Sequence, residues 1–150
     1  MKRQIVNYRS VNQKRAIVEY MNGEKTLFDT STNKDISHPY DEISDFKYNE
    51  DLNTEVSLVK LNIGKNLRRK DTLIGYINIE GKLVSNIYSI YFDKLYNVTD
   101  EKLDDLTKVI YDKLFCDSKV EEQKEKEATL KMSLLFKINK QSLNQSKVHN

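Results

Sequence analysis

Residues 16–29 read AIVEYMNGEKTLFD, and this stretch carries the clearest structural signal in the chain. Its centre, Asn22-Gly23, is a pair that accepts positive φ at both central positions of a type I′ turn. β-branched and aromatic residues flank the pair on both sides, as they do in paired strands. The sequence therefore predicts a β-hairpin over residues 15–29, with strands at about 15–21 and 24–29.

Four further segments before residue 93 are predicted as strands. Apolar and polar residues alternate over 54–63 and 72–80, the period expected of a strand with one buried face. A tight Glu-Gly turn then leads into KLVSNIYSIYF, residues 82–92, which fits a helical face as well as a strand face. Its β-branched and aromatic content favours a strand, so that 72–92 forms a second hairpin. A short strand at about 3–9 precedes the first hairpin.

The C-terminal half carries helix signals. Thr99 is a suitable N-cap, two acids follow it, and apolar residues then recur three and four positions apart. This pattern predicts a helix at about 100–115. Ser118 and Glu121 form a capping box, which predicts a second helix at about 119–128.

Residues 129–140, TLKMSLLFKINK, allow two interpretations. Apolar and polar residues alternate except at Leu135, which favours a strand at about 129–138. The alternative is one helix that continues to about 138, because Lys, Leu and Met also favour helices. The remaining residues, 139–150, form a polar tail.

Residues 29–53 lack a sustained period and contain the chain's one proline. Pro39 followed by Asp41 and Glu42 resembles a helix start, since proline is tolerated at the first helical position and acids favour the positive end of the helix dipole. We expect one or two helical turns over about 39–46 within a long acidic loop.

Strands followed by helices, with few β–α–β alternations, indicate an α+β fold. We expect an antiparallel sheet of about five to six strands, with the one or two helices of the C-terminal half packed on one face. Residues 1–138 would form a single domain.

The composition indicates the size class of the protein, the type of genome that encodes it and its compartment. The chain has 150 residues, 38% of them hydrophobic and 32% charged, which suits a small globular domain. Lys, Asn, Ile and Tyr are abundant while Ala, Gly and Pro are scarce, a bias that indicates an AT-rich genome of a low-GC bacterium, phage or plasmid. The basic N-terminus lacks the apolar core of a signal peptide, and no apolar run is long enough to span a membrane. Cys116 is the only cysteine, so we expect a cytoplasmic protein without a disulfide or membrane association.

Charge is segregated along the chain although the net charge is only +2. Residues 29–57 hold eight acids and two cations, whereas residues 58–97 hold seven cations and three acids. Residues 98–128 are acidic again, and residues 129–150 hold four lysines and no acid. Blocks of alternating sign can present separate acidic and basic faces to charged partners.

Catalytic motifs are largely missing. The two histidines, His38 and His149, stand beside no candidate nucleophile and in no metal-ligand spacing, and no glycine-rich phosphate loop exists. Pro39, Asp41 and the triplet 45–47 faintly resemble the proline–aspartate and acid-x-lysine motif of metal-dependent nucleases, but the spacing is far too tight. We expect no catalytic residue, metal site or cofactor.

The stretch KNLRRKD, residues 65–71, places four cations between two predicted strands, where a hairpin loop is expected. Several cations near one phosphate track are what nucleic-acid binding requires, and arginine forks also recognise carboxylates. Tyr76, Tyr88 and Tyr91 lie on neighbouring predicted strands and would stack on bases if exposed. The predicted partner- or nucleic-acid-binding residues are Lys65, Arg68, Arg69 and Lys70.

An acidic segment offers the opposite hypothesis. Six acids occur within 15 residues and define a candidate acidic partner-binding face: Asp41, Glu42, Asp45, Glu50, Asp51 and Glu55. Such a surface can occupy a basic protein groove that otherwise holds nucleic acid.

Three classes of function follow. The first is a non-enzymatic interaction protein that binds and sterically blocks a host or cognate protein such as a nuclease or toxin; it would be an immunity protein, an antitoxin or a phage inhibitor of host defence. The second is a nucleic-acid-binding accessory protein that uses the basic loop at 65–70. The third is a metal-dependent nuclease. We favour the first, because segregated charge without a catalytic motif suits binding better than chemistry.

Overall fold

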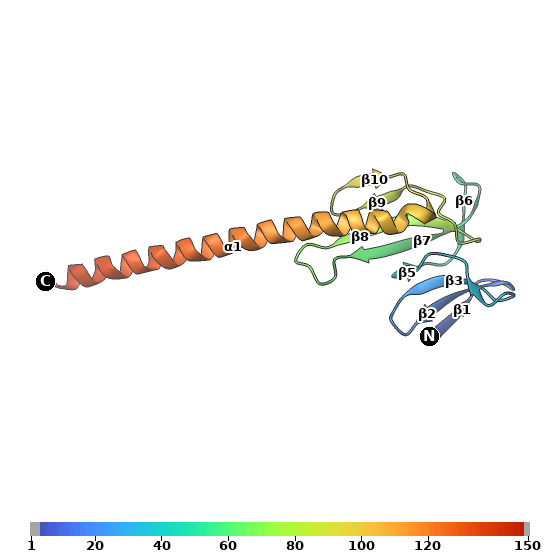
Figure 1. The fold of residues 1–150 in the computed structure, drawn as a ribbon, viewed down its shortest axis with the longest axis horizontal. Helices are drawn as coiled ribbons and strands as arrows, with labels where there is room; N and C mark the ends of the chain where they lie inside the picture. The colour runs from blue at the N-terminus through green and yellow to red at the C-terminus, as the bar shows by residue number, and fades with distance from the viewer. Residues whose placement is uncertain (1–3, 149–150) are drawn as a thin grey trace.

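The computed structural model describes residues 4–148, with side chains described as far as residue 138. Within this range the fold is α+β, as predicted: ten strands form two antiparallel sheets, and one long helix follows them (Figure 1). The predicted single sheet of five to six strands is thus two sheets, of four and six strands.

The four-stranded sheet contains the hairpin predicted at 15–29. Its strands run in the order β1 (Ile5–Ser10), β2 (Arg15–Tyr20), β3 (Lys25–Asp29) and β4 (Lys34–Asp35). The predicted turn type is wrong, because only Gly23 has positive φ, at 89°. Gly23 N–H donates to the Tyr20 carbonyl and Tyr20 N–H to the Glu24 carbonyl, so the loop is a three-residue turn with a glycine bulge.

The six-stranded sheet is built on the long pair β7 (Thr54–Ile63) and β8 (Asp71–Asn78). Its order is β10 (Lys94–Tyr96), β9 (Ile87–Ser89), β8, β7 and β5 (Glu42–Ile43), and β6 (Lys47–Asn49) also pairs with β7. β8 and β9 confirm the pairing predicted for 72–92, although residues 82–86 join it only through isolated contacts such as the Ile77–Leu83 bridge.

Three hairpin loops share one conformation. The loops that follow β3, β6 and β9 have four residues each and end on Asn33, Asn53 and Asp93, all with φ between 50° and 55°. Asn and Asp are the side chains that best tolerate this left-handed conformation. In two loops a tyrosine hydroxyl donates to the left-handed residue at 2.5 Å: Tyr48 to Asn53 and Tyr88 to Asp93. This recurrence was not predicted from the sequence.

The helix predicted at 39–46 is wrong. Tyr40 instead forms a bridge with Lys25, with backbone hydrogen bonds of 2.8 Å in both directions. Asp41 and Ser44 N–H groups donate to carbonyls of β7, at 2.9 and 3.0 Å. Backbone pairing with both sheets therefore outcompetes the local helix signals of this segment.

One helix replaces the two predicted helices and the strand predicted at 129–138. After a short 3₁₀ turn, Asp100–Lys102, α1 runs from Leu103 to Val148 and also includes most of the predicted tail. The capping box at Ser118 does not open a new helix, because its hydroxyl accepts a hydrogen bond from Arg69 N–H at 2.9 Å. No Gly or Pro interrupts residues 103–148, and the helix-forming residues at 129–138 continue it. None of the described helices is long and apolar enough to cross a membrane.

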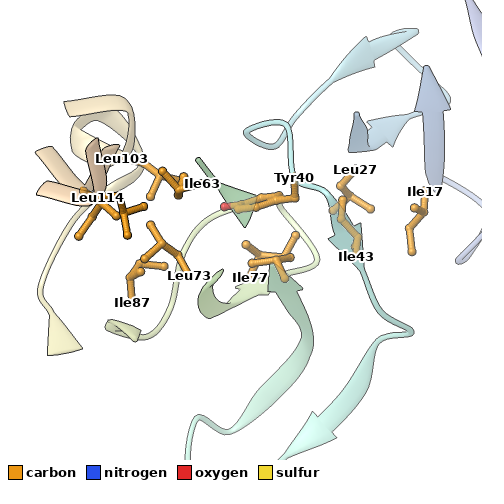
Figure 2. Close-up of a cluster of buried hydrophobic side chains, with 12 residues drawn as sticks. Ile17, Leu27, Tyr40, Ile43, Ile63, Leu73, Ile77, Ile87, Leu103 and Leu114 are labelled. Atoms are coloured by element: carbon orange, nitrogen blue, oxygen red, sulfur yellow. The ribbon is translucent and has the colours of Figure 1, made fainter. Parts of the chain in front are cut away.

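The larger of two hydrophobic clusters joins the two sheets and the helix, and a smaller one contains Ala16, Val18 and Tyr20. The first turns of α1 bury three apolar side chains in the larger cluster, Leu103, Ile110 and Leu114. In Figure 2 Tyr40 lies between this helix side of the core and the side chains of Ile43, Leu27 and Ile17. The core therefore spans both sheets.

We predict that Gly81→Ala destabilises the fold by about 2–4 kcal/mol, because it adds a steric clash to left-handed backbone strain. Gly81 has a φ of 80°, and a Cβ there would clash with the Ile36 carbonyl oxygen. Gly23→Ala is the matched control, since its φ is 89° but no atom lies within 4 Å of the added carbon. Urea unfolding of both variants measures the difference, and equal losses would contradict the close contact.

Candidate protein-binding surface

The basic loop holds the helix in place. Arg68 forms an ion pair with Glu125, and Arg69 pairs with Glu121 while its backbone N–H binds Ser118. We call these contacts the helix clamp. They join residues 49 to 57 positions apart, and they set the basic block of residues 58–97 against the acidic helix.

The remaining two cations of the loop differ from each other. Lys65 Nζ lies 2.6 Å from Asp41 Oδ1, which links the predicted basic loop to the predicted acidic face. Lys70 is exposed and makes no ion pair within the described part of the chain. Three of the four predicted binding residues therefore already hold carboxylates, and a phosphate would have to displace those carboxylates.

The three tyrosines considered for base stacking occupy different environments. Tyr76 is partly exposed on β8. The Tyr88 hydroxyl donates to Asp93, and this hydrogen bond raises the pKa of Tyr88. Desolvation and a 3.0 Å hydrogen bond to Asp117 raise the pKa of Tyr91, whose hydroxyl thus contacts the helix. No common stacking surface for the three rings follows from these contacts.

The six predicted acidic residues divide into two groups. Asp41 is half-buried: its Oδ1 binds Lys65, and its Oδ2 accepts the Asn62 N–H at 2.7 Å. Glu42 lies 3.4 Å from Lys60, and Asp45 lies 3.3 Å from Arg9. Cations thus accompany these three acids, and the described residues contain no cluster of three or more metal-ligating side chains.

The other three acids, Glu50, Asp51 and Glu55, are exposed and make no ion pair in the part of the chain that the structure describes. They lie on the β6–β7 hairpin, residues 47–56, which we call the acidic hairpin. Tyr48 is 61% exposed on the same hairpin and pairs across the strands with Glu55. The acidic hairpin therefore combines unpaired carboxylates with an exposed aromatic ring.

A groove borders the acidic hairpin. It has a volume of about 420 Å³, and its lining comprises Ser44, Asp45, Lys47, Tyr48, Asn49, Val56, Leu58 and Tyr76. The hairpin lies at the start of β7, whereas the basic loop follows the end of this ten-residue strand, about 33 Å away along an extended chain. In Figure 1 the label of β6 accordingly lies at the end of the molecule remote from the C-terminus.

A polar cavity near the start of α1 was not foreseen from the sequence. It has a volume of about 630 Å³, and His38, Tyr40, Asp41, Lys65 and Asp104 are among its lining residues. His38 Nε2 lies 3.5 Å from Asp104 Oδ1. Burial has the largest effect on the pKa of His38 and lowers it, although the Asp104 charge acts in the opposite direction. Burial also raises the pKa of Tyr40, whose hydroxyl has no hydrogen-bond partner among the described residues. Burial thus favours the neutral form of both groups.

In comparisons with known proteins, no family model, curated protein or solved structure matches this chain.

We predict that Arg68→Ala combined with Arg69→Ala speeds amide hydrogen exchange over residues 118–126, because both ion pairs of the helix clamp are lost. The free energy of unfolding should change by no more than about 1 kcal/mol, since the ion pairs are largely exposed. Lys70→Ala is the matched control, a neighbouring cation without an ion pair in the described residues. If the double variant and Lys70→Ala exchange alike, the two ion pairs of the clamp do not order the helix.

We also predict that His38 makes stability depend on pH. Its pKa is lowered from 6.5 in the folded chain, so the unfolded chain binds the proton more tightly, and stability falls as pH drops from above 6.5 through the folded pKa. His38→Gln should flatten this dependence in urea unfolding measured between about pH 4.5 and 7.5. Asp104→Asn should steepen it, because the Asp104 charge raises the pKa of His38; unchanged slopes in both variants would contradict the assignment.

Proposed function

We propose that this protein is a non-enzymatic interaction protein that binds a partner protein through the acidic hairpin and sterically blocks it. The observation that carries the proposal is the exposure of Glu50, Asp51 and Glu55 without intramolecular cations in the described structure. Carboxylates already paired within the fold must exchange partners on binding, whereas these three need lose only water.

The hairpin is also ordered before binding. Its loop ends on the left-handed Asn53, and the 2.5 Å hydrogen bond from the Tyr48 hydroxyl to Asn53 fixes that turn. A preorganised loop loses less conformational entropy when it docks than a flexible one. Tyr48 adds an exposed aromatic ring, a residue type enriched at the energetic centre of interfaces.

The chemistry of the hairpin indicates the kind of partner. Three carboxylates beside a tyrosine complement a basic groove lined by Arg and Lys, the kind of groove that holds nucleic acid in nucleases and in nucleic-acid-cleaving toxins. The amino-acid bias indicates a low-GC bacterium, phage or plasmid. We therefore propose that the protein is an immunity protein, an antitoxin or a phage inhibitor of a host defence nuclease. The inhibition is steric, and no bond is made or broken.

The alternative of nucleic-acid binding through the basic loop receives less support. Lys65, Arg68 and Arg69 are engaged by Asp41, Glu125 and Glu121. Phosphate binding would therefore first break the helix clamp.

We predict that reversing the charge of the acidic hairpin, with Glu50→Lys, Asp51→Lys and Glu55→Lys, abolishes capture of the partner. Glu101→Lys, Asp105→Lys and Asp112→Lys make the matched control, because they cause the same change in net charge at exposed positions of the helix region. Affinity purification from host lysate with each protein identifies candidates that require the hairpin. With the purified partner, the association rate should fall about tenfold or more in the hairpin variant and in high salt.

A second readout tests the steric mechanism. The purified partner's nuclease or toxin activity should decrease in proportion to added wild-type protein and remain unaffected by the hairpin variant. Equal capture by both triple variants would contradict the proposal. Binding of short DNA or RNA that the Arg68→Ala and Arg69→Ala changes weaken would instead support the basic loop.

A further inference from the structure

A cleft lies between the two sheets, at the end of the core that is remote from α1. It has a volume of about 310 Å³, which is at the lower end of the range for small-molecule sites. Ile17, Ile43 and Leu58 line it, and the first two are only 6% and 4% exposed. In Figure 2 Ile17 and Ile43 lie at the opposite end of the core from Leu103 and Leu114. The cleft therefore has an apolar floor.

Charged side chains from both sheets also line the cleft: Arg9, Glu19, Lys25, Glu42 and Lys60. Three of them are already neutralised within the fold. Lys60 lies 3.4 Å from Glu42. Arg9 lies 3.3 Å from Asp45 and donates to the Ile43 carbonyl at 3.1 Å. Glu19 and Lys25 are the two charges of the cleft that remain.

Glu19 and Lys25 face each other across β2 and β3 but form no ion pair. They are directly opposite in the register, which places their Cβ atoms roughly 4.5–5.5 Å apart on the same face of the sheet. The Lys25 ammonium instead donates to the Asp41 carbonyl at 3.0 Å. Glu19 makes no ion pair in the part of the chain that the structure describes. A half-buried carboxylate and a half-buried ammonium thus line the cleft without neutralising each other.

These two side chains define the chemistry of a ligand. The Glu19 carboxylate only accepts hydrogen bonds, whereas the Lys25 ammonium has three donors, of which the Asp41 carbonyl takes one. A ligand ammonium beside Glu19 and a ligand carboxylate beside Lys25 would each form a charge-assisted hydrogen bond. Because residues opposite each other on paired strands are close, the two ligand charges must also lie close together. They do so in a free α-amino acid, where one carbon carries both groups.

The rest of the cleft selects among small charged molecules. A simple anion would be repelled by Glu19 and a simple cation by Lys25, whereas a molecule with both charges meets each with its opposite. A peptide does not fit both groups, since its terminal charges lie at the two ends of the chain. The apolar floor complements an aliphatic side chain, which gains free energy when it leaves water.

We propose that the cleft between the sheets binds a free α-amino acid with an aliphatic side chain, such as leucine. Glu19 binds the ligand ammonium, Lys25 binds its carboxylate, and the apolar floor contacts its side chain. This inference is independent of the acidic hairpin, because the lining of the cleft includes none of the hairpin residues 47–56.

We predict that L-leucine binds saturably to the wild-type chain, and that the amide shifts in an NMR titration concentrate on residues 17–19, 25 and 43–44. N-acetyl-L-leucine, which lacks the ammonium, and L-leucinamide, which lacks the carboxylate, should each bind about tenfold or more weakly. L-Aspartate should also bind more weakly, because its side chain would place a charge on the apolar floor. Absence of saturable shifts at millimolar leucine overturns the proposal, and so does equal binding of the three leucine compounds.

Two variants test the assigned contacts with the same titration. Glu19→Gln should weaken the binding of leucine about tenfold or more but not that of N-acetyl-L-leucine, which lacks the group that Glu19 binds. Lys25→Met should likewise weaken the binding of leucine but not that of leucinamide. Glu101→Gln is the matched control, an exposed acid outside the cleft. The charge-reversed acidic hairpin should bind leucine as the wild type does, so the two proposals fail separately. Unchanged leucine affinity in Glu19→Gln overturns the assignment of this site.

Discussion

The segment from Tyr40 to Ser44 is the constraint on which the rest of the fold depends, because it belongs to both sheets. Tyr40 pairs with β3 through two 2.8 Å backbone hydrogen bonds, and the next residues pair with β7. The Tyr40 ring and Ile43 fill the core between the sheets and the helix. Without this segment the four-stranded sheet would share no backbone pairing with the six-stranded one in the described structure.

This constraint also explains what sequence reasoning could and could not predict. The hairpin at 15–29 was predictable because its turn and its flanking β-branched residues act over a few positions. The helix predicted at 39–46 was wrong because Pro39, Asp41 and Glu42 are signals of the same short range, and backbone partners 14 to 19 residues away override them. The predicted α+β class is confirmed although the helix at 39–46 was wrong, because this class depends only on strands that precede a helix.

Contacts of still longer range decide which of the predicted binding residues are paired. The sequence shows four cations in one loop and six acids in one segment, but which of them pair depends on the segments that the fold brings next to them. Arg68 and Arg69 meet glutamates that lie more than 50 residues later. Glu50, Asp51 and Glu55 stay unpaired in the described chain because their hairpin lies at the opposite end of β7. The sequence shows where the charged blocks lie, but only the fold determines which charged side chains pair with each other and which stay exposed.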